Sequence, residues 1–223
     1  MSSYGEIYQK WRTAAGPDWP AYVDHKFVRG LQDGSLPKDA FLHFLTQDYV
    51  FLIHFSRAWA LAITKAETVE EMRLCAGTVN VLINEEIALH VKTCAAAGIS
   101  EDQLFSAVER TENLAYTRYV LDAGHSGDFL DLMAALAPCV IGYGEIGARI
   151  SADYAPEYAD WVETYSSDDF QDACKAVGQL IDGAVARRLG DNPEQSPRWA
   201  RLCERFNMAT KLEIGFWDMG LTP

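Results

Sequence analysis

A cysteine on an interrupted helix is the residue of this sequence best suited to covalent chemistry. Cys139 directly follows Pro138, and Tyr143 lies one helical turn further along the same face. The thiolate form of cysteine is a nucleophile that can bond covalently to a substrate. The alternative is a kinked core helix with a small buried thiol, since free cysteine is among the most buried residue types.

We expect the helix around Cys139, from about Asp128 to Ala152, to be strained. Pro138 lacks an amide proton, and its ring collides with the preceding helical turn. The glycines at positions 142, 144 and 147 each cost about 1 kcal/mol relative to alanine inside a helix. A helix that carries this much strain usually has a reason for it. The residues on the other helices help to decide between a functional and a structural role for Cys139.

Three carboxylates fall on the apolar stripes of three different predicted helices: Asp48, Glu86 and Glu213. Aspartate and glutamate are almost never fully buried unless paired, because an unpaired buried carboxylate is costly or takes up a proton. A stripe assigned in the wrong phase could explain one such case. Three of them, together with Cys139, predict a central polar pocket.

Tyrosines could form the walls of this pocket. Tyr116, Tyr143 and Tyr165 would offer flat, hydrogen-bonding surfaces suited to an aromatic ring. Each of them could equally be an ordinary core tyrosine.

The histidines allow a metal site to be considered. Glu86 and His90 form an E-x-x-x-H pair on one helix face, which is half of a possible di-iron site. A full site needs a second such pair from a later helix, and no histidine follows His125. We therefore favour a structural role for His90 and predict no metal. Nucleophile-elbow and phosphate-loop motifs are also absent.

The elements that carry these residues all show helical periodicity. The predicted inward stripe of the first long helix runs from Phe41 through Asp48 and Phe51 to Ala62. The next stripe contains Met72, Cys75, Val79, Leu82, Glu86 and Leu89. No convincing strand or domain linker appears, so we predict one all-α, single-domain helical bundle over residues 1–223.

Composition narrows the class of protein further. The net charge of −13 disfavours nucleic acid and anionic membranes as partners. Five cysteines without paired spacing indicate a reducing compartment, and we expect a cytoplasmic protein. We find no signal peptide and no apolar run that approaches the ~20 residues of a membrane span.

Several separate motifs, in order, resemble the TenA family (thiaminase II, aminopyrimidine aminohydrolase). The resemblance covers about His25 to Trp217. The matching motifs are His25-Lys-Phe-Val-Arg-Gly30, Asp33-Gly-Ser-Leu-Pro37, Gln47-Asp48, His54-Phe55, Glu86-x-x-x-His90, Pro138-Cys139 with Tyr143, Trp161-x-x-x-Tyr165, and Glu213 with Phe216-Trp217. The resemblance implies the all-α, haem-oxygenase-like fold and the branch of the family that contains the cysteine.

The resemblance also implies a role for each candidate residue. Cys139 matches the nucleophile, Glu213 the acid/base, and Asp48 the carboxylate that binds the amino group and ring nitrogen of a pyrimidine. Tyr116, Tyr143 and Tyr165 match the aromatic pocket and the hydrogen bonds to the thiol, and Glu86 is placed with the substrate-binding residues. Phe51 stands where some members have tyrosine, so a hydroxyl contact is missing there while the stacking surface remains.

The implied activity is hydrolysis of thiamin-related pyrimidines. The expected reaction converts 4-amino-5-aminomethyl-2-methylpyrimidine to the hydroxymethyl pyrimidine with release of ammonia, and also cleaves thiamin. The expected assembly is a homotetramer that binds an aminopyrimidine or thiamin and no metal, organic cofactor, nucleic acid or membrane. Alternatives on the same fold are a haem oxygenase with His25 as ligand, a di-iron oxidase, a quinone-cofactor synthase, and a non-enzymatic pyrimidine-binding regulator.

Overall fold

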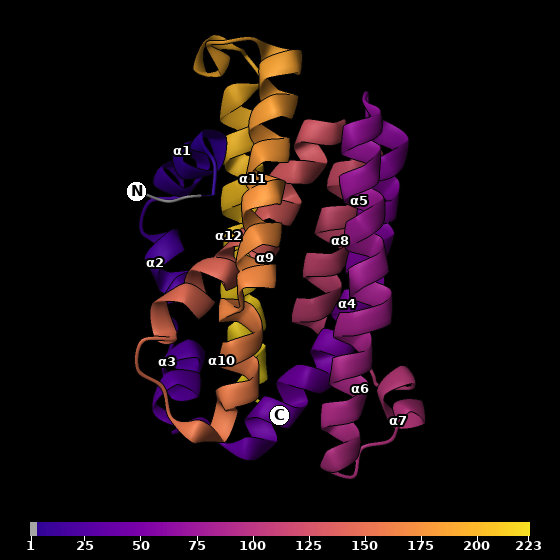
Figure 1. Ribbon diagram of the computed structural model, residues 1–223, viewed down its shortest axis with the longest axis vertical. Coiled ribbons are helices and arrows are strands. Elements are labelled where there is room, and N and C mark those ends of the chain that lie inside the picture. The colour runs from indigo at the N-terminus through magenta and orange to yellow at the C-terminus, as the bar shows by residue number, and fades with distance from the viewer. Residues whose placement is uncertain (1–3) are drawn as a thin grey trace. The chain divides into compact units, whose positions relative to one another are not determined.

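All regular structure in residues 4–223, the part of the chain that the computed structural model describes, is helical. The helices are drawn in chain order from indigo to yellow in Figure 1. The all-α class predicted from the periodicity is therefore confirmed.

The chain divides into two compact units, each assembled from stretches far apart in sequence. The first unit comprises Met1–Leu36 and Met133–Ile214, and the second comprises Pro37–Leu132 and Gly215–Pro223. Helices α9 (Phe129–Ile150) and α12 (Trp199–Gly220) contribute residues to both units. The assignment of residues 1–223 to a single domain stays a prediction.

The first unit contains most of the N-terminal and C-terminal helices. Its elements are α1 (Glu6–Ala14), α2 (Asp18–Val23), α3 (Lys26–Asp33), most of α9, the 3-10 turn η2 (Pro156–Tyr158), α10 (Ala159–Ser166), α11 (Asp168–Leu189), the 3-10 turn η3 (Pro193–Gln195) and most of α12. Helix α11 packs against α1 and α10. Asp182 of α11 also caps α1, since its carboxylate accepts the amide protons of Glu6 and Ile7 at 2.9 and 2.8 Å.

The second unit is organised around one long helix. Its elements are α4 (Lys38–Lys65), α5 (Val69–Val81), the π turn η1 (Leu82–Glu86), α6 (Ile87–Ala96), α7 (Glu101–Phe105), α8 (Thr111–Ser126), the first residues of α9 and the last turns of α12. Helix α4 packs against α5, α6 and α8, which lie side by side with it in Figure 1.

The π turn changes which residues of the α5–α6 segment face inward. A π turn inserts an extra residue into the helical repeat, and such turns are frequent at functional sites. Met72 and Leu89, predicted to be inward, are 39% and 40% exposed, whereas His90 and Cys94 are buried. The predicted stripe is therefore wrong at Met72, which precedes the π turn, and wrong again beyond Leu82, where an unbroken α-helical repeat was assumed.

Close packing accounts for the glycines of α9, which continues as a helix through Pro138. A Cβ on Gly142 would lie 2.5 Å from Cε1 of Tyr22, and one on Gly144 would lie 2.6 Å from Sγ of Cys174. A Cβ on Gly147 would collide with the backbone carbonyl of Tyr165. Each glycine therefore allows a different neighbour to approach the helix backbone.

Helix α9 is also more apolar than its sequence pattern indicated. Among the described residues it is the one helix long and apolar enough to cross a membrane, with a mean hydropathy of 1.5. Since 83% of that apolar window is buried inside the protein, α9 has the properties of a core helix. The prediction that no apolar run approaches the length of a membrane span therefore does not hold for α9.

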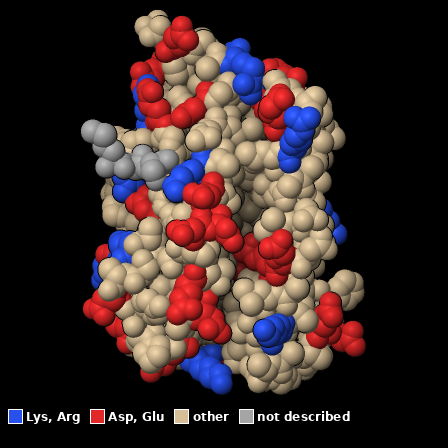
Figure 2. Space-filling model, viewed as in Figure 1, with Lys and Arg blue, Asp and Glu red and all other residues tan. Residues whose placement is uncertain are grey.

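Acidic side chains gather in several groups on the face shown in Figure 2, with basic side chains scattered between them. This distribution agrees with the net charge of −13. A negative surface repels polyanions, which is the physical reason to disfavour nucleic acid as a partner.

Candidate active site

Helix α9 presents the candidate nucleophile to the first unit. Cys139 is half-buried and Tyr143 is buried one turn later. The ring of Tyr143 lies 5.0 Å from that of Tyr165 at an interplanar angle of 63°, and Trp161 packs against both rings. Two of the three predicted tyrosines thus form one aromatic cluster on the α9 and α10 side of this unit.

A tyrosine that the sequence pattern did not single out lies beside Cys139. Tyr22 of α2 is fully buried, and its hydroxyl donates a hydrogen bond to the carbonyl of Pro138 at 3.1 Å. Burial raises the pKa of Tyr22 well above its ordinary value, and electrostatic interactions with Glu213 and Cys139 raise it further. Tyr22 therefore remains a hydroxyl donor at neutral pH.

Glu213 of α12 belongs to the same unit and is 1% exposed. Glu213 and Cys139 both act electrostatically on Tyr22, so the buried tyrosine lies within electrostatic reach of both candidate catalytic groups. The predicted inward position of Glu213 is confirmed.

The second unit brings together the predicted residues of α4 and α8. Phe51 and Tyr116 are both buried, and their ring centroids are 5.0 Å apart. Phe216, from the part of α12 in this unit, lies 5.3 Å from Phe51. Phe51 is thus surrounded by aromatic rings, and one turn before it Asp48 is 4% exposed.

Asp48 is paired with a histidine from the helix that follows the π turn. Nε2 of His90 lies 2.7 Å from Oδ2 of Asp48, and Nδ1 of the same ring lies 2.9 Å from the backbone carbonyl of Glu86. Burial lowers the pKa of His90, but the hydrogen bond and charge of Asp48 and the charge of Glu86 outweigh it, so the net shift is upward.

Glu86 itself differs from expectation. It is half-exposed, so two of the three carboxylates predicted to face inward do so and Glu86 does not. The π turn ends at Glu86, and the rotation it introduces gives the inward position to His90 instead.

The residues present do not favour a di-iron centre. Both ring nitrogens of His90 are engaged, one by a backbone carbonyl and one by Asp48. Within residues 4–223, no group of three or more His, Cys, Asp or Glu side chains is arranged to hold a metal ion. A di-iron carboxylate site needs several such ligands on facing helices.

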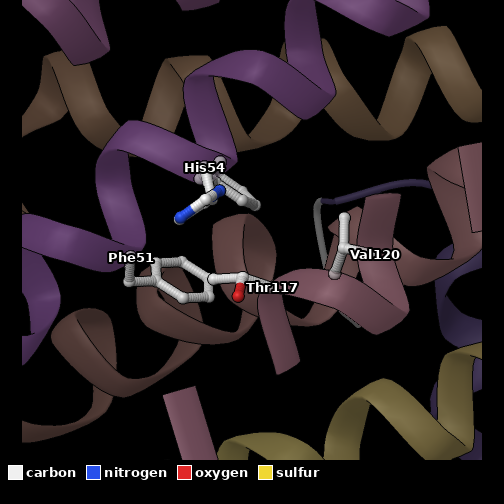
Figure 3. A pocket seen from close by; sticks show the side chains of 5 residues that line it. Phe51, His54, Thr117 and Val120 are labelled. Atoms are coloured by element: carbon white, nitrogen blue, oxygen red, sulfur yellow. The ribbon is translucent and has the colours of Figure 1, made fainter. Parts of the chain in front are cut away.

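A small crevice lies between α4 and α8, where Figure 3 shows Phe51 and His54 beside Thr117 and Val120. These four residues and Phe55 line it, and its volume, with the space open to solvent included, is about 150 Å³. Small-molecule pockets usually measure about 300–1,000 Å³. The crevice contains one predicted site residue, Phe51, and it is too small to be the substrate pocket.

The predicted site residues thus fall into two sets. Cys139, Tyr143, Tyr165 and Glu213 belong to the first unit, and Asp48, Phe51, Glu86 and Tyr116 belong to the second. The sequence pattern missed Tyr22 as a neighbour of Cys139 and indicated a rim or core position for His90. The sequence contained a signal for His90, because this residue belongs to the Glu86-x-x-x-His90 motif. None of the matching motifs contains Tyr22.

Comparison with known proteins gives one consistent family. The sequence model of the TENA/THI-4/PQQC family matches residues 12–222. A crystal structure of a TenA family transcription regulator from Silicibacter sp. TM1040 superposes with a TM-score of 0.97, at 60% identity over 99% of this chain and 98% of that one.

Two curated relatives carry names that describe enzymes. The aminopyrimidine aminohydrolase of Halalkalibacterium halodurans is 34% identical over 223 residues, which cover 98% of this chain and 95% of the relative. A hydroxymethylpyrimidine/phosphomethylpyrimidine kinase of Saccharomyces cerevisiae is 30% identical over 92% of this chain, a match that covers 37% of the kinase.

Proposed function

The chain belongs to the TENA/THI-4/PQQC family, and from this premise we propose that it is an aminopyrimidine aminohydrolase that serves thiamin salvage. Its substrate would be 4-amino-5-aminomethyl-2-methylpyrimidine, and its products the hydroxymethyl pyrimidine and ammonia. The observation that carries the proposal is the 34% identity to an aminopyrimidine aminohydrolase along nearly the full length of both chains. The match to a hydroxymethylpyrimidine kinase supports the same product, since such an enzyme uses a hydroxymethyl pyrimidine.

In the proposed mechanism, Asp48 binds the amidine-like edge of the pyrimidine and Cys139 supplies the nucleophile. Sγ of Cys139 bonds to a ring carbon, and the electron pair of the broken ring π bond moves to the ring nitrogens. These electrons then expel the exocyclic amine, which takes a proton from Glu213 and leaves as ammonia. A positioned proton donor of this kind contributes typically ~10²–10⁴-fold to the rate.

The second half of the reaction restores the enzyme. Water adds to the exocyclic methylene, Glu213 takes the proton that the water loses, and the C–S bond breaks to release the hydroxymethyl pyrimidine. The balance is one water consumed and one ammonia formed. The same steps with the thiazole of thiamin as leaving group would cleave thiamin, which we include in the proposal.

The side chains around these groups have proposed supporting roles. Tyr143 and Tyr165 would provide aromatic surfaces in the first unit, and the tilted pair Phe51 and Tyr116 would do so in the second. Glu86 would contribute through its backbone carbonyl, which accepts the Nδ1 proton of His90. No organic cofactor is part of this chemistry.

The proposal also covers the cellular compartment and the oligomeric state of the protein. Five free cysteines support a reducing compartment such as the cytoplasm. Apolar side chains exposed on the second unit, among them Val81, Ile83, Phe105 and Val108, support a homotetramer, because such side chains are commonly covered by another subunit.

The second candidate is a regulator that binds a pyrimidine without turning it over. It is favoured by the Silicibacter relative, which is described as a transcription regulator and is 60% identical. The net charge of −13 weighs against direct contact with DNA. Incubating the purified chain with the aminomethyl pyrimidine, while measuring ammonia and the pyrimidine product by mass spectrometry, separates the two. We expect equal amounts of both products over many turnovers, whereas tight binding without ammonia would support the regulator.

A further inference from the structure

The π turn places His90 between two oxygen atoms. Its ring is 5% exposed, with Nδ1 at 2.9 Å from the carbonyl of Glu86 and Nε2 at 2.7 Å from Oδ2 of Asp48. Without the extra residue of η1 the inward position would belong to Leu89, which is exposed instead. A local departure from α-helical geometry is therefore used to bring an imidazole to Asp48.

The hydrogen-bond partners of His90 determine its protons. A backbone carbonyl can only accept, so Nδ1 must carry a proton. An ionised carboxylate also only accepts, so Nε2 must carry one as well. A neutral imidazole has one N–H and would leave a lone pair facing Oδ2 at 2.7 Å. The geometry thus requires a proton on each ring nitrogen of His90, which is one proton more than the neutral imidazole carries.

The charges around His90 favour keeping this proton on the ring. The charged groups that act on it are Asp48 from α4 and Glu86 from the π turn, and both are acidic. The other carboxylate oxygen of Asp48, Oδ1, accepts no hydrogen bond from residues 4–223. A carboxylate with one oxygen held by a cation and the other without a donor can receive a ligand.

We propose that His90 is a positioning residue that stays an imidazolium at neutral pH, pairs its charge with the buried carboxylate of Asp48 and leaves Oδ1 of Asp48 available to the amidine-like edge of the pyrimidine. The identity of the ligand rests on the proposed function, whereas the charged pair does not. Removing one partner of such a pair leaves an uncompensated buried charge, which is strongly unfavourable.

His54 provides an internal control on the same helix as Asp48. Its two ring nitrogens lie 3.2 Å from guanidinium nitrogens of Arg57 and Arg118. Burial and the charge of Arg118 lower the pKa of His54, and Figure 3 shows it at the edge of the α4–α8 crevice. The two histidines should therefore have opposite charge states in one sample.

The first experiment measures these charge states directly. Full-length protein labelled with ¹⁵N-histidine is studied by NMR at pH 7.5, with signals assigned through His90→Gln and His54→Gln. We expect both nitrogens of His90 to be protonated and His54 to have one unprotonated nitrogen. An unprotonated nitrogen on His90 at this pH overturns the charged pair, whatever the catalytic activity of the protein.

The second experiment measures binding of the hydroxymethyl pyrimidine across pH 6.5–9 for wild type, His90→Gln and His54→Gln. Glutamine keeps a donor for Asp48 but carries no charge, so the buried carboxylate of Asp48 loses its compensating cation and binding at pH 7 should weaken by about tenfold or more. The ratio of variant to wild-type Kd should approach one as the pH rises through the raised pKa of His90, because wild type then loses the same positive charge. His54→Gln should follow wild type throughout.

The two experiments distinguish failure of the His90 proposal from failure of the proposed function. A loss of affinity in His90→Gln that is equal at every pH would reduce His90 to a packing role and overturn the proposal. If wild type does not bind the pyrimidine at all, the proposed function fails, while the NMR measurement still decides whether the pair is charged.

Discussion

The hydroxyl of Tyr22 donates a hydrogen bond to the carbonyl of Pro138, 3.1 Å away, at the peptide that joins Pro138 to Cys139. Tyr22 also fills the space that the missing side chain of Gly142 leaves open one turn later. The tyrosine of α2 thereby fixes the turn of α9 that carries the candidate nucleophile.

Replacing Tyr22 by phenylalanine should reduce catalysis more than stability. The change removes one buried hydrogen bond, which costs about 0.5–1.5 kcal/mol. It also frees the turn that carries Cys139, and small misplacements of a reacting group can lower rates by up to ~100-fold. We expect kcat for ammonia release to fall at least about tenfold, a loss within that range.

Tyr8→Phe is the matched control for this prediction. Tyr8 is also fully buried and donates one hydrogen bond of 3.1 Å to α9, but to the side chain of Glu145. Both variants should lose similar stability in urea unfolding, and only Tyr22→Phe should lose turnover. Equal activity in the two variants would mean that Tyr22 has a packing role alone.

The glycine at position 142 should be intolerant of a methyl group. Its Cβ would lie 2.5 Å from Cε1 and 2.8 Å from the hydroxyl of Tyr22, so Gly142→Ala overpacks the core and should destabilise by about 1–3 kcal/mol. A Cβ on Gly77 of α5 would instead have open space, with no neighbour within 4 Å. Gly77→Ala should therefore stabilise the protein by about 0.5–1 kcal/mol through helix propensity. Denaturant unfolding of both variants is the test, and a stabilised Gly142→Ala would contradict the packing.

His54 should make stability fall as the pH is lowered. Its pKa in the folded protein is below the ordinary value of 6.5, so between the two values the unfolded chain binds more protons. The contribution is fully present above about pH 6.5 and is lost as the pH falls through the folded-state pKa. The difference in Tm between wild type and His54→Gln should therefore increase from about pH 5 to about pH 7. A difference that is constant over this range would show that His54 does not titrate differently on folding.

Glu213 and Asp48 should respond differently to removal of their charge. Glu213→Gln keeps shape and hydrogen bonding but cannot transfer a proton, so kcat should fall steeply while pyrimidine affinity changes little. Asp48→Asn should weaken binding at least as much as turnover, because it removes the acceptor of the amidine-like edge. Paired measurements of Kd and kcat test this, and equal losses of both in Glu213→Gln would move the proton transfer to another group.

Much of the helical framework follows from sequence because its causes are local. The stripe of α4 places Phe44, Asp48, Phe51 and Phe55 inward, and the structure buries all four. Glu213 falls on the inward face of α12 for the same reason. Hydrophobic periodicity, helix caps and helix-breaking residues act within a few positions, so they can be recognised in a single sequence.

The remaining features depend on contacts that sequence spacing does not encode. Tyr22 and Pro138 are separated by 116 positions, and the glycines of α9 are explained only by the neighbours that approach them. The π turn before His90 has no composition signal of its own, yet it places His90 in the buried position and leaves Leu89 exposed. Tertiary packing therefore decided the part of the site that the periodicity missed.

The most direct test of the central claim compares ammonia release and pyrimidine binding for wild type and Cys139→Ser. The replacement is nearly isosteric and should leave stability and affinity almost unchanged, but serine lacks the nucleophilicity of a thiolate. We predict that Cys139→Ser binds the aminomethyl pyrimidine like wild type and releases no measurable ammonia. Ammonia release at the wild-type rate would contradict the account, because Cys139 would then be a structural residue and the covalent mechanism would be wrong.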